Sequence, residues 1–370
     1  MSRNAIRRRH TVCHFYWVFF VLVAAIMLRA GTPAADEATF PGESWEYYAS
    51  PEEAGFCAEK LGAVREATEE LDTAAVMIVY RGRVVDAWGN LEEKYRCHSL
   101  RKSFLSALYG IQVERGVINL DATLEELGID DNDSLTIIEK QATVHMLLKA
   151  RSGVYHPALY ETRAMAARRP ERHLFKPGEN YYYNNWDFNA LGTIYEQETG
   201  EKIHASFEQR IARPIGMEDF TAEDGRYVTG SASMHAAYPF HMSARDLARF
   251  GLLFLNEGAW NGQQIVPKAW VRESIRPHSD LGEYEGRPES GAYGYMWWIE
   301  IDGRHFSGVD AVPEGTFSGR GARGQILTVV PKYDLVFVHR VDTRDTDYRV
   351  SYGAIGQLLM QTIEAMQAGE

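Results

Sequence analysis

The order of hydrophobic patterns along the chain constrains its fold more than any other feature of the sequence. Five strand-like runs lie near the two ends of the chain, at 74–80, 84–88, 295–301, 325–330 and 335–341. Between about residues 119 and 289 the apolar residues recur at helical spacing, and Gly and Pro divide the segment into separate helices. Strands from both ends can pair only if the middle of the chain leaves the sheet and returns to it.

This arrangement predicts an α+β fold in which an antiparallel sheet is flanked by helices and an all-helical domain is inserted. We expect residues 36–118 and 290–370 to form the sheet domain and residues 119–289 the mainly helical domain. Amphipathic spacing predicts helices at 51–71 and 350–366. The 370 residues, 45% of them hydrophobic, supply enough apolar side chains for a large core.

The segment from Leu100 to Val113 is almost wholly apolar apart from a few residues such as Arg101 and Lys102. A helix of this composition has no wide polar face. It is therefore predicted to be buried on most sides and to end at Gly116.

The first 35 residues have the composition of a targeting segment. A basic run at 7–9 precedes an apolar stretch at 15–28, and small residues follow. About fourteen apolar residues are too few to span a hydrocarbon layer roughly 30 Å thick, but they suit the centre of a signal peptide. We expect export to the periplasm or the cell exterior. An uncleaved segment that tethers the protein to a membrane stays open, because Arg29 and Pro33 make a poor cleavage site.

The balance of charge argues against nucleic acid and anionic lipid as partners. The chain has 39 Lys and Arg against 51 Asp and Glu, a formal charge of −12. Five of the basic residues lie in the first 35, which leaves 34 basic against 51 acidic residues and a formal charge of −17. A body this acidic is repelled by phosphate backbones and anionic lipid. We expect no nucleic-acid partner, and membrane contact only through an uncleaved leader.

Cysteine and histidine spacing gives no sign of a metal site. No zinc-type set of Cys and His and no His-Glu-x-x-His occurs. A Gly-x-Gly-x-x-Gly at 319–324 leads into a strand that ends at Pro331, whereas a dinucleotide fingerprint leads into a helix. We therefore expect neither a metal nor a cofactor. Once the leader is removed, Cys57 and Cys97 remain, and the sequence leaves open whether they pair.

The chain contains one Ser-x-x-Lys tetrapeptide, Ser99 to Lys102, at the start of the predicted buried helix. At the first turn of a helix a serine lies near free backbone N–H groups, which favour an oxyanion. Residue i+3 lies on the same face, and a lysine on an apolar helix loses its solvation, so that its amine can take the serine's proton. Ser99 is thus a candidate nucleophile with Lys102 as its base. A capping serine beside a lysine that reaches solvent is the alternative.

An aromatic and amide-rich segment follows a Pro-Gly turn at 177–178 and precedes a predicted helix that contains Leu191-Gly192. Together with the Ser-x-x-Lys at 99–102, it resembles the serine β-lactamase and D-Ala-D-Ala peptidase superfamily. More narrowly, it is similar to the class C β-lactamase-related hydrolases, which include esterases, D-aminopeptidases and 6-aminohexanoate-oligomer hydrolases. Similar landmarks occur in order at 145–148, 151–153, 242–251, 261–262, 265–267 and 293–298.

The Tyr-x-Asn motif of that family corresponds to Tyr183 and Asn185, and by pattern alone Tyr182 and Asn184 form an overlapping alternative. The resemblance implies that Tyr183 and Lys102 carry the proton from the nucleophile to the leaving group. It also implies that Asn185 holds the substrate or the lysine in place.

The third motif of the family, Lys-Thr-Gly or His-x-Gly on a strand at the sheet edge, is altered here. The corresponding residues are Gly319, Arg320, Gly321 and Ala322. Gly319 stands where the family has a cation that helps to bind a substrate carboxylate, which predicts poor recognition of β-lactams and of D-Ala-D-Ala peptides. Arg320 or Arg323 can supply positive charge from a neighbouring position. The resemblance places the N–H of Ala322 beside that of Ser99 around the oxyanion, and glycine at 321 lets the backbone approach the substrate.

These motifs predict a serine hydrolase that forms an acyl-enzyme on Ser99 and cleaves small carboxylic esters or amides, without being an efficient β-lactamase. The expected partner is a small-molecule ester, amide or peptide. Two alternatives stay open: a D-amino-acid or cell-wall peptidase, and a catalytically silent binding protein of the same fold. The intact first two motifs argue against the silent protein, and only the altered third motif argues for it.

Overall fold

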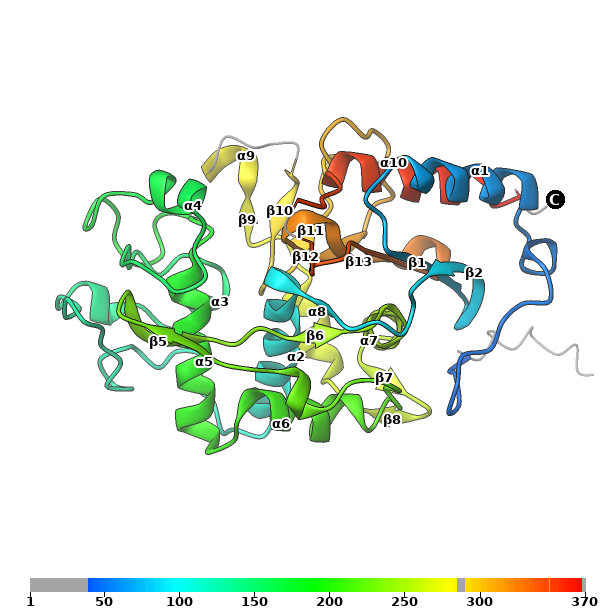
Figure 1. Cartoon of the computed structure of the whole chain (residues 1–370). Helices are drawn as coiled ribbons and strands as arrows, with labels where there is room; N and C mark the ends of the chain where they lie inside the picture. Colours follow the sequence, from blue (N-terminus) through cyan, green and yellow to red (C-terminus); the bar gives the residue numbers. More distant parts are fainter. Residues whose placement is uncertain (1–38, 285–289, 346, 368–370) are drawn as a thin grey trace, which may run out of the picture. The chain divides into compact units, whose positions relative to one another are not determined.

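An eight-stranded antiparallel sheet is central to the computed structural model, which describes residues 39–284, 290–345 and 347–367. The strand order is β2-β1-β14-β13-β12-β11-β10-β9, so strands from both halves of the chain lie side by side (Figure 1). The strands are β1 (Ala75–Tyr80), β2 (Arg83–Gly89), β9 (Ser279–Asp280), β10 (Ala292–Tyr293), β11 (Trp298–Ile299), β12 (Phe317–Gly321), β13 (Gln325–Val330) and β14 (Leu335–Arg340). This sheet with its helices confirms the predicted α+β fold. The predicted leader at 1–35 lies outside the described residues.

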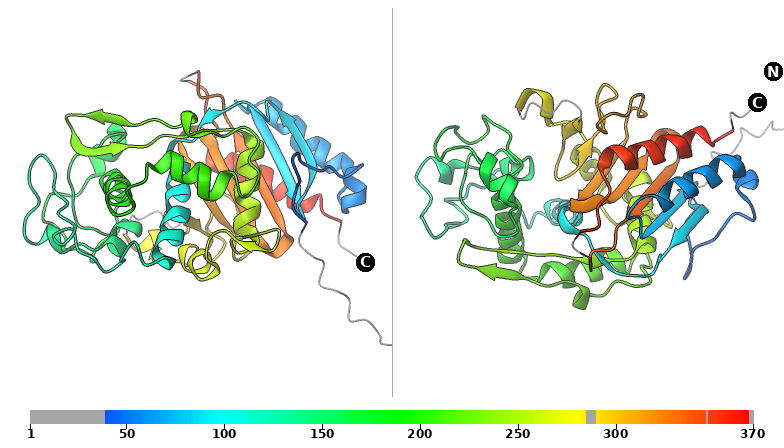
Figure 2. Two further views of the ribbon diagram at one scale, coloured as in Figure 1. Left: turned by 90° about the horizontal axis from the view of Figure 1, so that it is seen from below. Right: turned by 45° about the horizontal axis from the view of Figure 1, so that its top comes forward.

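Helices cover both faces of the sheet. On one face α1 (Ala58–Glu69) and α10 (Tyr352–Glu364) pack side by side (Figure 1 and Figure 2). On the other face α7 (Ala244–Leu255) crosses β1, β13 and β14, and α2 (Arg101–Glu114) packs on β12. Successive residues of β1 therefore belong to two different cores. This explains why the strands read as continuous apolar runs rather than as an alternation of apolar and polar residues.

The other helices and the short strands lie mainly between residues 119 and 289. The helices are α3 (Val144–Leu148), α4 (Arg163–Arg168), α5 (Asn185–Thr199), α6 (Ile203–Phe207), α8 (Lys268–Ser274) and α9 (Leu281–Tyr284). Two-stranded sheets join β3 (Tyr95–Arg96) to β6 (His241–Met242), β4 (Val228–Gly230) to β5 (Ser233–Ala237), and β7 (Ala259–Trp260) to β8 (Gln263–Gln264). Among the described helices, none is both long and apolar enough to cross a membrane.

Three details differ from the pattern-based expectation. The helix expected at 51–71 is interrupted at Gly55, whose φ of 79° ends a 3₁₀ turn ahead of α1. The strand expected at 295–301 is reduced to β11, because Met296 adopts a left-handed conformation with φ 63°. Strand β9 joins the sheet although it precedes residue 290, and the division into two domains stays a prediction.

Helix α2 is the buried helix that the sequence predicts. Every residue from Arg101 to Gly110 is buried. The ring of Phe104 packs against the rings of Phe207, Phe240 and Phe250, with centroids 5.0, 5.2 and 5.0 Å away. A helix packed on all sides is held in one position, so the side chains of its first turn are held as well.

Replacing Gly110 by Ala should destabilise the fold, because a Cβ there would overlap the indole of Trp270, with Nε1 only 2.8 Å away. We expect the free energy of unfolding to fall by about 1–3 kcal/mol in urea denaturation, which outweighs the roughly 1 kcal/mol gained in helix propensity. Gly62 on α1 is the matched control, since a Cβ there meets nothing within 4 Å. Gly62→Ala should raise stability, and equal effects of the two substitutions would contradict this packing.

Candidate active site

Ser99 lies in a tight turn between β3 and α2. The turn is a 3₁₀ segment, His98–Leu100, and His98 adopts a left-handed conformation with φ 48°. The chain just before it is fixed, because the N–H of Cys97 donates to the carbonyl of Phe240 at 2.9 Å. Such a conformation persists only where the surroundings enforce it. The turn brings Ser99 to the wall of a cavity of about 650 Å³.

Lys102 lies one helical turn further along and is 1% exposed. Its Nζ is 3.2 Å from Ser99 Oγ, 2.5 Å from Tyr183 OH and 2.8 Å from Asn185 Oδ1. Burial, and then the positive charge of Arg101, hold the pKa of the Lys102 amine well below its ordinary value. The structure therefore brings together the predicted nucleophile, its predicted base and both residues of the second motif.

The second motif is positioned by the start of α5. Asn185 is the first residue of that helix, and Asn184 caps it by accepting from the N–H of Trp186 at 3.1 Å. Burial raises the pKa of Tyr183 above its ordinary range, so its phenol stays protonated at neutral pH. The Nδ2 of Asn185 donates to the carbonyl of Tyr160 at 2.7 Å, which leaves Oδ1 to face the lysine.

The structure separates the two registers that the sequence left open. Tyr182 OH donates to the carbonyl of Met165 at 2.8 Å, and Asn184 Nδ2 donates to the carbonyl of Val154 at 2.7 Å. Neither of these hydrogen bonds involves Lys102. Tyr183 and Asn185 are the pair that faces Lys102.

The third motif lies on β12, beside the turn that carries Ser99. A Cβ at Gly321 would overlap the carbonyl of Cys97, so the strand can approach this turn only with glycine at that position. Ala322 follows directly and lines the same cavity as Ser99. A Cβ at Gly319 would lie 3.1 Å from Ser103 Oγ, in tightly packed surroundings. Position 319, where the resemblance leads one to expect a Lys or His, is thus occupied by glycine and has little free volume around it.

The two arginines near this motif have different surroundings. Arg320 lines the cavity, is 5% exposed, and its guanidinium lies 5.0 Å from the ring of Trp298. It donates to the carbonyl of His305, and burial lowers its pKa to about 10. Arg323 instead donates to the carbonyls of Asp345 and Tyr348 and is not among the lining residues. Of the two, Arg320 is the cation that the cavity contains.

Other reactive groups near Ser99 are poorly suited to the chemistry. Cys97 is a free, buried thiol whose pKa burial raises to about 11. Cys57, also free, lies at the start of α1 and does not line the cavity. His98 lines the cavity, but burial and the charge of Arg96 lower its pKa to about 4, so it is neutral and a weak base. No group of His, Cys, Asp and Glu within the described ranges is arranged to hold a metal ion.

Aromatic rings dominate the wall of the cavity. The aromatic lining residues are Tyr160, Phe175, Tyr181, Tyr182, Tyr183, Tyr284, Trp298 and Tyr352. The charged lining residues of the described chain are Arg168 and Arg320, and no carboxylate accompanies them. An acidic protein therefore presents an aromatic and positively charged cavity.

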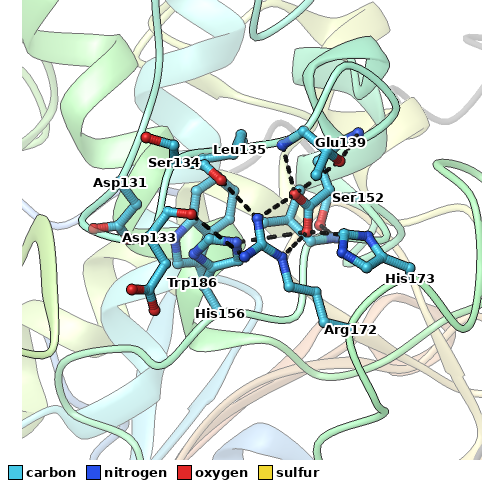
Figure 3. A network of polar contacts seen from close by, with 12 residues as sticks. Asp131, Asp133, Ser134, Leu135, Glu139, Ser152, His156, Arg172, His173 and Trp186 are labelled. Atoms are coloured by element: carbon cyan, nitrogen blue, oxygen red, sulfur yellow. Dashed lines mark hydrogen bonds and ion pairs between the residues drawn. The ribbon is translucent and has the colours of Figure 1, made fainter.

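One wall of the cavity is the segment 160–175, and Arg172 anchors it. The guanidinium of Arg172 donates Nε to Glu139 Oε1 at 2.9 Å and Nη2 to Oε2 at 2.8 Å (Figure 3). It also donates to the carbonyls of Asp133 and Ser134 (Figure 3). Motif matching missed this wall, and the sequence has no periodic signal for it because its anchors come from distant parts of the chain.

Glu139 keeps its charge although it is 2% exposed. Burial disfavours the carboxylate, but His156, whose Nε2 lies 3.5 Å from Oε1, and the hydrogen bonds from Arg172 outweigh it and hold the pKa well below its ordinary value. A depressed carboxyl pKa means that the ion pair is complete at neutral pH and is lost only as the pH falls towards that pKa. The wall is therefore anchored across the whole neutral range.

Arg172→Gln should loosen this wall, because it removes the bidentate ion pair and leaves the Glu139 carboxylate buried without its partner. We expect KM for a bulky aryl ester to rise more than kcat falls, since Arg172 contacts neither Ser99 nor Lys102. Arg163→Gln is the matched control, because Arg163 is an exposed arginine of α4 outside the cavity lining. An unchanged KM in Arg172→Gln, measured by steady-state kinetics, would contradict the anchoring role.

Comparisons with known proteins identify the family of this chain. Residues 62–352 match the family described as Beta-lactamase. An uncharacterised protein of Alkalihalophilus pseudofirmus is 21% identical over 308 residues, which cover 74% of this chain and 86% of that protein. The 6-aminohexanoate-dimer hydrolase of Paenarthrobacter ureafaciens is 31% identical over 131 residues, which cover 34% of this chain and 31% of that enzyme.

Solved structures show the same fold. A putative 6-aminohexanoate-dimer hydrolase from Bacillus anthracis superposes with a TM-score of 0.61 at 24% identity, covering 82% of this chain and 81% of that one. A family VIII carboxylesterase superposes with a TM-score of 0.58 at 16% identity, covering 84% of this chain and 99% of that one. The family match spans most of the chain and confirms the resemblance seen in the motifs, so this protein belongs to the beta-lactamase family, a family of hydrolases.

Proposed function

We propose that this protein is a serine hydrolase that forms an acyl-enzyme on Ser99 and cleaves small carboxylic esters or amides. The observation that carries the proposal is the proton path, in which Lys102 Nζ lies 3.2 Å from Ser99 Oγ and 2.5 Å from Tyr183 OH. Because burial favours the neutral form of the lysine, its amine can accept the proton of the serine. A relative named as a 6-aminohexanoate-dimer hydrolase and a structural neighbour named as a family VIII carboxylesterase support this class of reaction.

In the proposed mechanism Ser99 Oγ attacks the substrate carbonyl carbon, and its proton passes to Lys102, directly or through Tyr183. The carbonyl oxygen becomes an oxyanion, for which we assign the backbone N–H groups of Ser99 and Ala322 as donors. The tetrahedral intermediate collapses when the bond to the alcohol or amine breaks, and the leaving group takes up the proton. A water molecule then attacks the acyl-enzyme, gives its proton to the same groups, and releases the acid and the free serine.

The cavity suits uncharged or anionic substrates with apolar or aromatic groups, because aromatic rings line it and its charged side chains are cations. Its volume of about 650 Å³ leaves room for more than an acetyl ester. The peptidase alternative requires a cation for the terminal carboxylate, and Arg320 is the described candidate for it. The silent binding protein is disfavoured by the short contacts of Lys102 with Ser99 and Tyr183.

Ser99→Ala should abolish hydrolysis of p-nitrophenyl butyrate, with a loss of about 10³-fold or more in kcat, because the nucleophile is removed. Covalent labelling by a fluorophosphonate should disappear as well. Ser106→Ala is the control on α2, the helix that follows the turn of Ser99, since its hydroxyl is fully buried, does not line the cavity and has no hydrogen-bond partner in the described structure. A Ser99→Ala variant that kept ester turnover near the wild-type rate would refute the assignment.

Esters should be cleaved much better than β-lactams. A charge-assisted hydrogen bond to the ring carboxylate is worth roughly 1.5–3 kcal/mol, or about ten- to a hundred-fold in rate, and Gly319 cannot supply it. We therefore expect hydrolysis of p-nitrophenyl acetate or butyrate and little turnover of nitrocefin. Equal kcat/KM values for nitrocefin and the esters would show that another cation, with Arg320 the first to replace, takes over this role.

A further inference from the structure

Helix α5 carries two buried asparagines one turn apart, and each bonds one of two neighbouring cations on α2. Asn185 Oδ1 accepts from Lys102 Nζ at 2.8 Å, and Asn189 Oδ1 accepts from Arg101 Nη2 at 3.3 Å. The Nδ2 of each amide donates to a carbonyl of residues 159–160, at the start of the cavity wall. Two consecutive cations are thus inserted between α2 and α5 in the same manner.

The charge of Arg101 is buried without a counter-ion. Its side chain is 0% exposed, and its acceptors are the carbonyl of His98 at 3.3 Å and the amide oxygen of Asn189. The guanidinium lies 5.4 and 4.8 Å from the ring centroids of Tyr160 and Tyr238, and its Nε has no hydrogen-bond partner. No carboxylate of the described chain forms an ion pair with it.

Another fully buried arginine shows that the fold can neutralise such a charge. Arg249 is also 0% exposed, but it pairs with Glu218 at 3.1 Å. An arginine keeps its proton under ordinary conditions, whereas a lysine can lose its own when it is buried. Of two adjacent basic groups that form no ion pair with a carboxylate of the described chain, the lysine is the one that can give up its charge.

We propose that the buried charge of Arg101 keeps the neighbouring amine of Lys102 unprotonated, so that Arg101 is a positioning residue that acts through Lys102. The inference rests on the proposed function, since it concerns the base of that reaction. Arg101 itself does not line the cavity. Its charge also acts on the phenol of Tyr183, whose pKa burial nevertheless raises, so the lysine is the group of the site whose protonation it controls.

The groups that face Lys102 from other elements are uncharged. Ser99 faces it from the 3₁₀ turn, Tyr183 from the loop before α5, and Asn185 and Phe188 from α5 itself. The phenol of Tyr183 stays protonated because burial raises its pKa. Burial is therefore the larger cause of the low pKa of Lys102, and the charge of Arg101 is the second.

The nearby groups that titrate do not compete with this effect. Asp187 on α5 accepts from Ser152 and Asn184 instead, and burial raises its pKa well above the ordinary value. His98 and His204, on which the charge of Arg101 also acts, have their pKa lowered to about 4, chiefly by burial. Both histidines are neutral throughout the pH range of an ester assay.

The test is the pH dependence of kcat/KM for p-nitrophenyl butyrate between pH 5 and pH 10. The acid limb of this profile reports protonation of the base, so loss of a neighbouring positive charge moves it to higher pH. We expect Arg101→Met to shift the limb upward by about one pH unit or more, and Arg101→Lys, which keeps the charge, to leave it close to the wild-type position. The proposal would be overturned if Arg101→Met left the acid limb unmoved or did not bring it above pH 5. It would also be overturned if the two variants shifted the limb equally.

A second pair of variants covers the case in which Arg101→Met fails to fold. Asn189→Asp gives the guanidinium a carboxylate without removing it, and Asn189→Ala removes the same hydrogen bonds without adding charge. We expect the acid limb of the pH profile to shift upward in Asn189→Asp but not in Asn189→Ala. Acid limbs at the same pH in the two variants would contradict the proposal.

The rate of fluorophosphonate labelling, followed over the same pH range with the labelled residue identified by mass spectrometry, separates the two proposals. Label on Ser99 with an unmoved limb refutes the role of Arg101 while the proposed function stands. No label on Ser99 in the wild-type protein refutes both.

Discussion

The site depends on a buried amine that forms no ion pair with any carboxylate of the described residues. Lys102 is 1% exposed, and moving an unpaired ammonium out of water costs several kcal/mol. The rings of Tyr183 and Phe188, with centroids 4.0 and 4.2 Å from Nζ, recover about 0.5–2 kcal/mol each if the amine is charged. Desolvation outweighs this gain, so burial shifts the equilibrium towards the neutral amine and holds the pKa of Lys102 well below its ordinary value. The packing that keeps water away from α2 thus disfavours the ammonium and leaves the lone pair of the amine available to accept a proton.

The features that the sequence predicted are those that depend on local pattern. The runs that became β1, β13 and β14 were visible because a sheet covered on both faces needs apolar residues at every position. The proximity of Ser99 and Lys102 follows from helical spacing alone. Strand β12 was recognised by its motif and not by hydrophobicity, because its close approach to the turn before Ser99 requires glycine where a strand usually has a larger residue.

The features that the sequence could not supply are contacts between distant segments. Nothing local decides between Tyr182 and Tyr183, because the choice depends on which of two adjacent side chains turns towards α2 and which towards the wall. The wall itself is held by residues far along the chain, as the bond of Arg172 to Glu139 shows. The sequence likewise gives no sign of the role of Arg101. Its burial without a carboxylate partner becomes visible only when α2, α5 and the cavity wall are assembled.

The amide of Asn185 joins the base to the cavity wall, since Oδ1 accepts from Lys102 and Nδ2 donates to the carbonyl of Tyr160. A ligand too large for the cavity would displace that wall, and the amide would move with it. The lysine would then lose the acceptor that orients it while the ligand was still bound. Selection among related compounds would consequently act on turnover as well as on affinity, and an oversized compound that did bind would act as a competitive inhibitor.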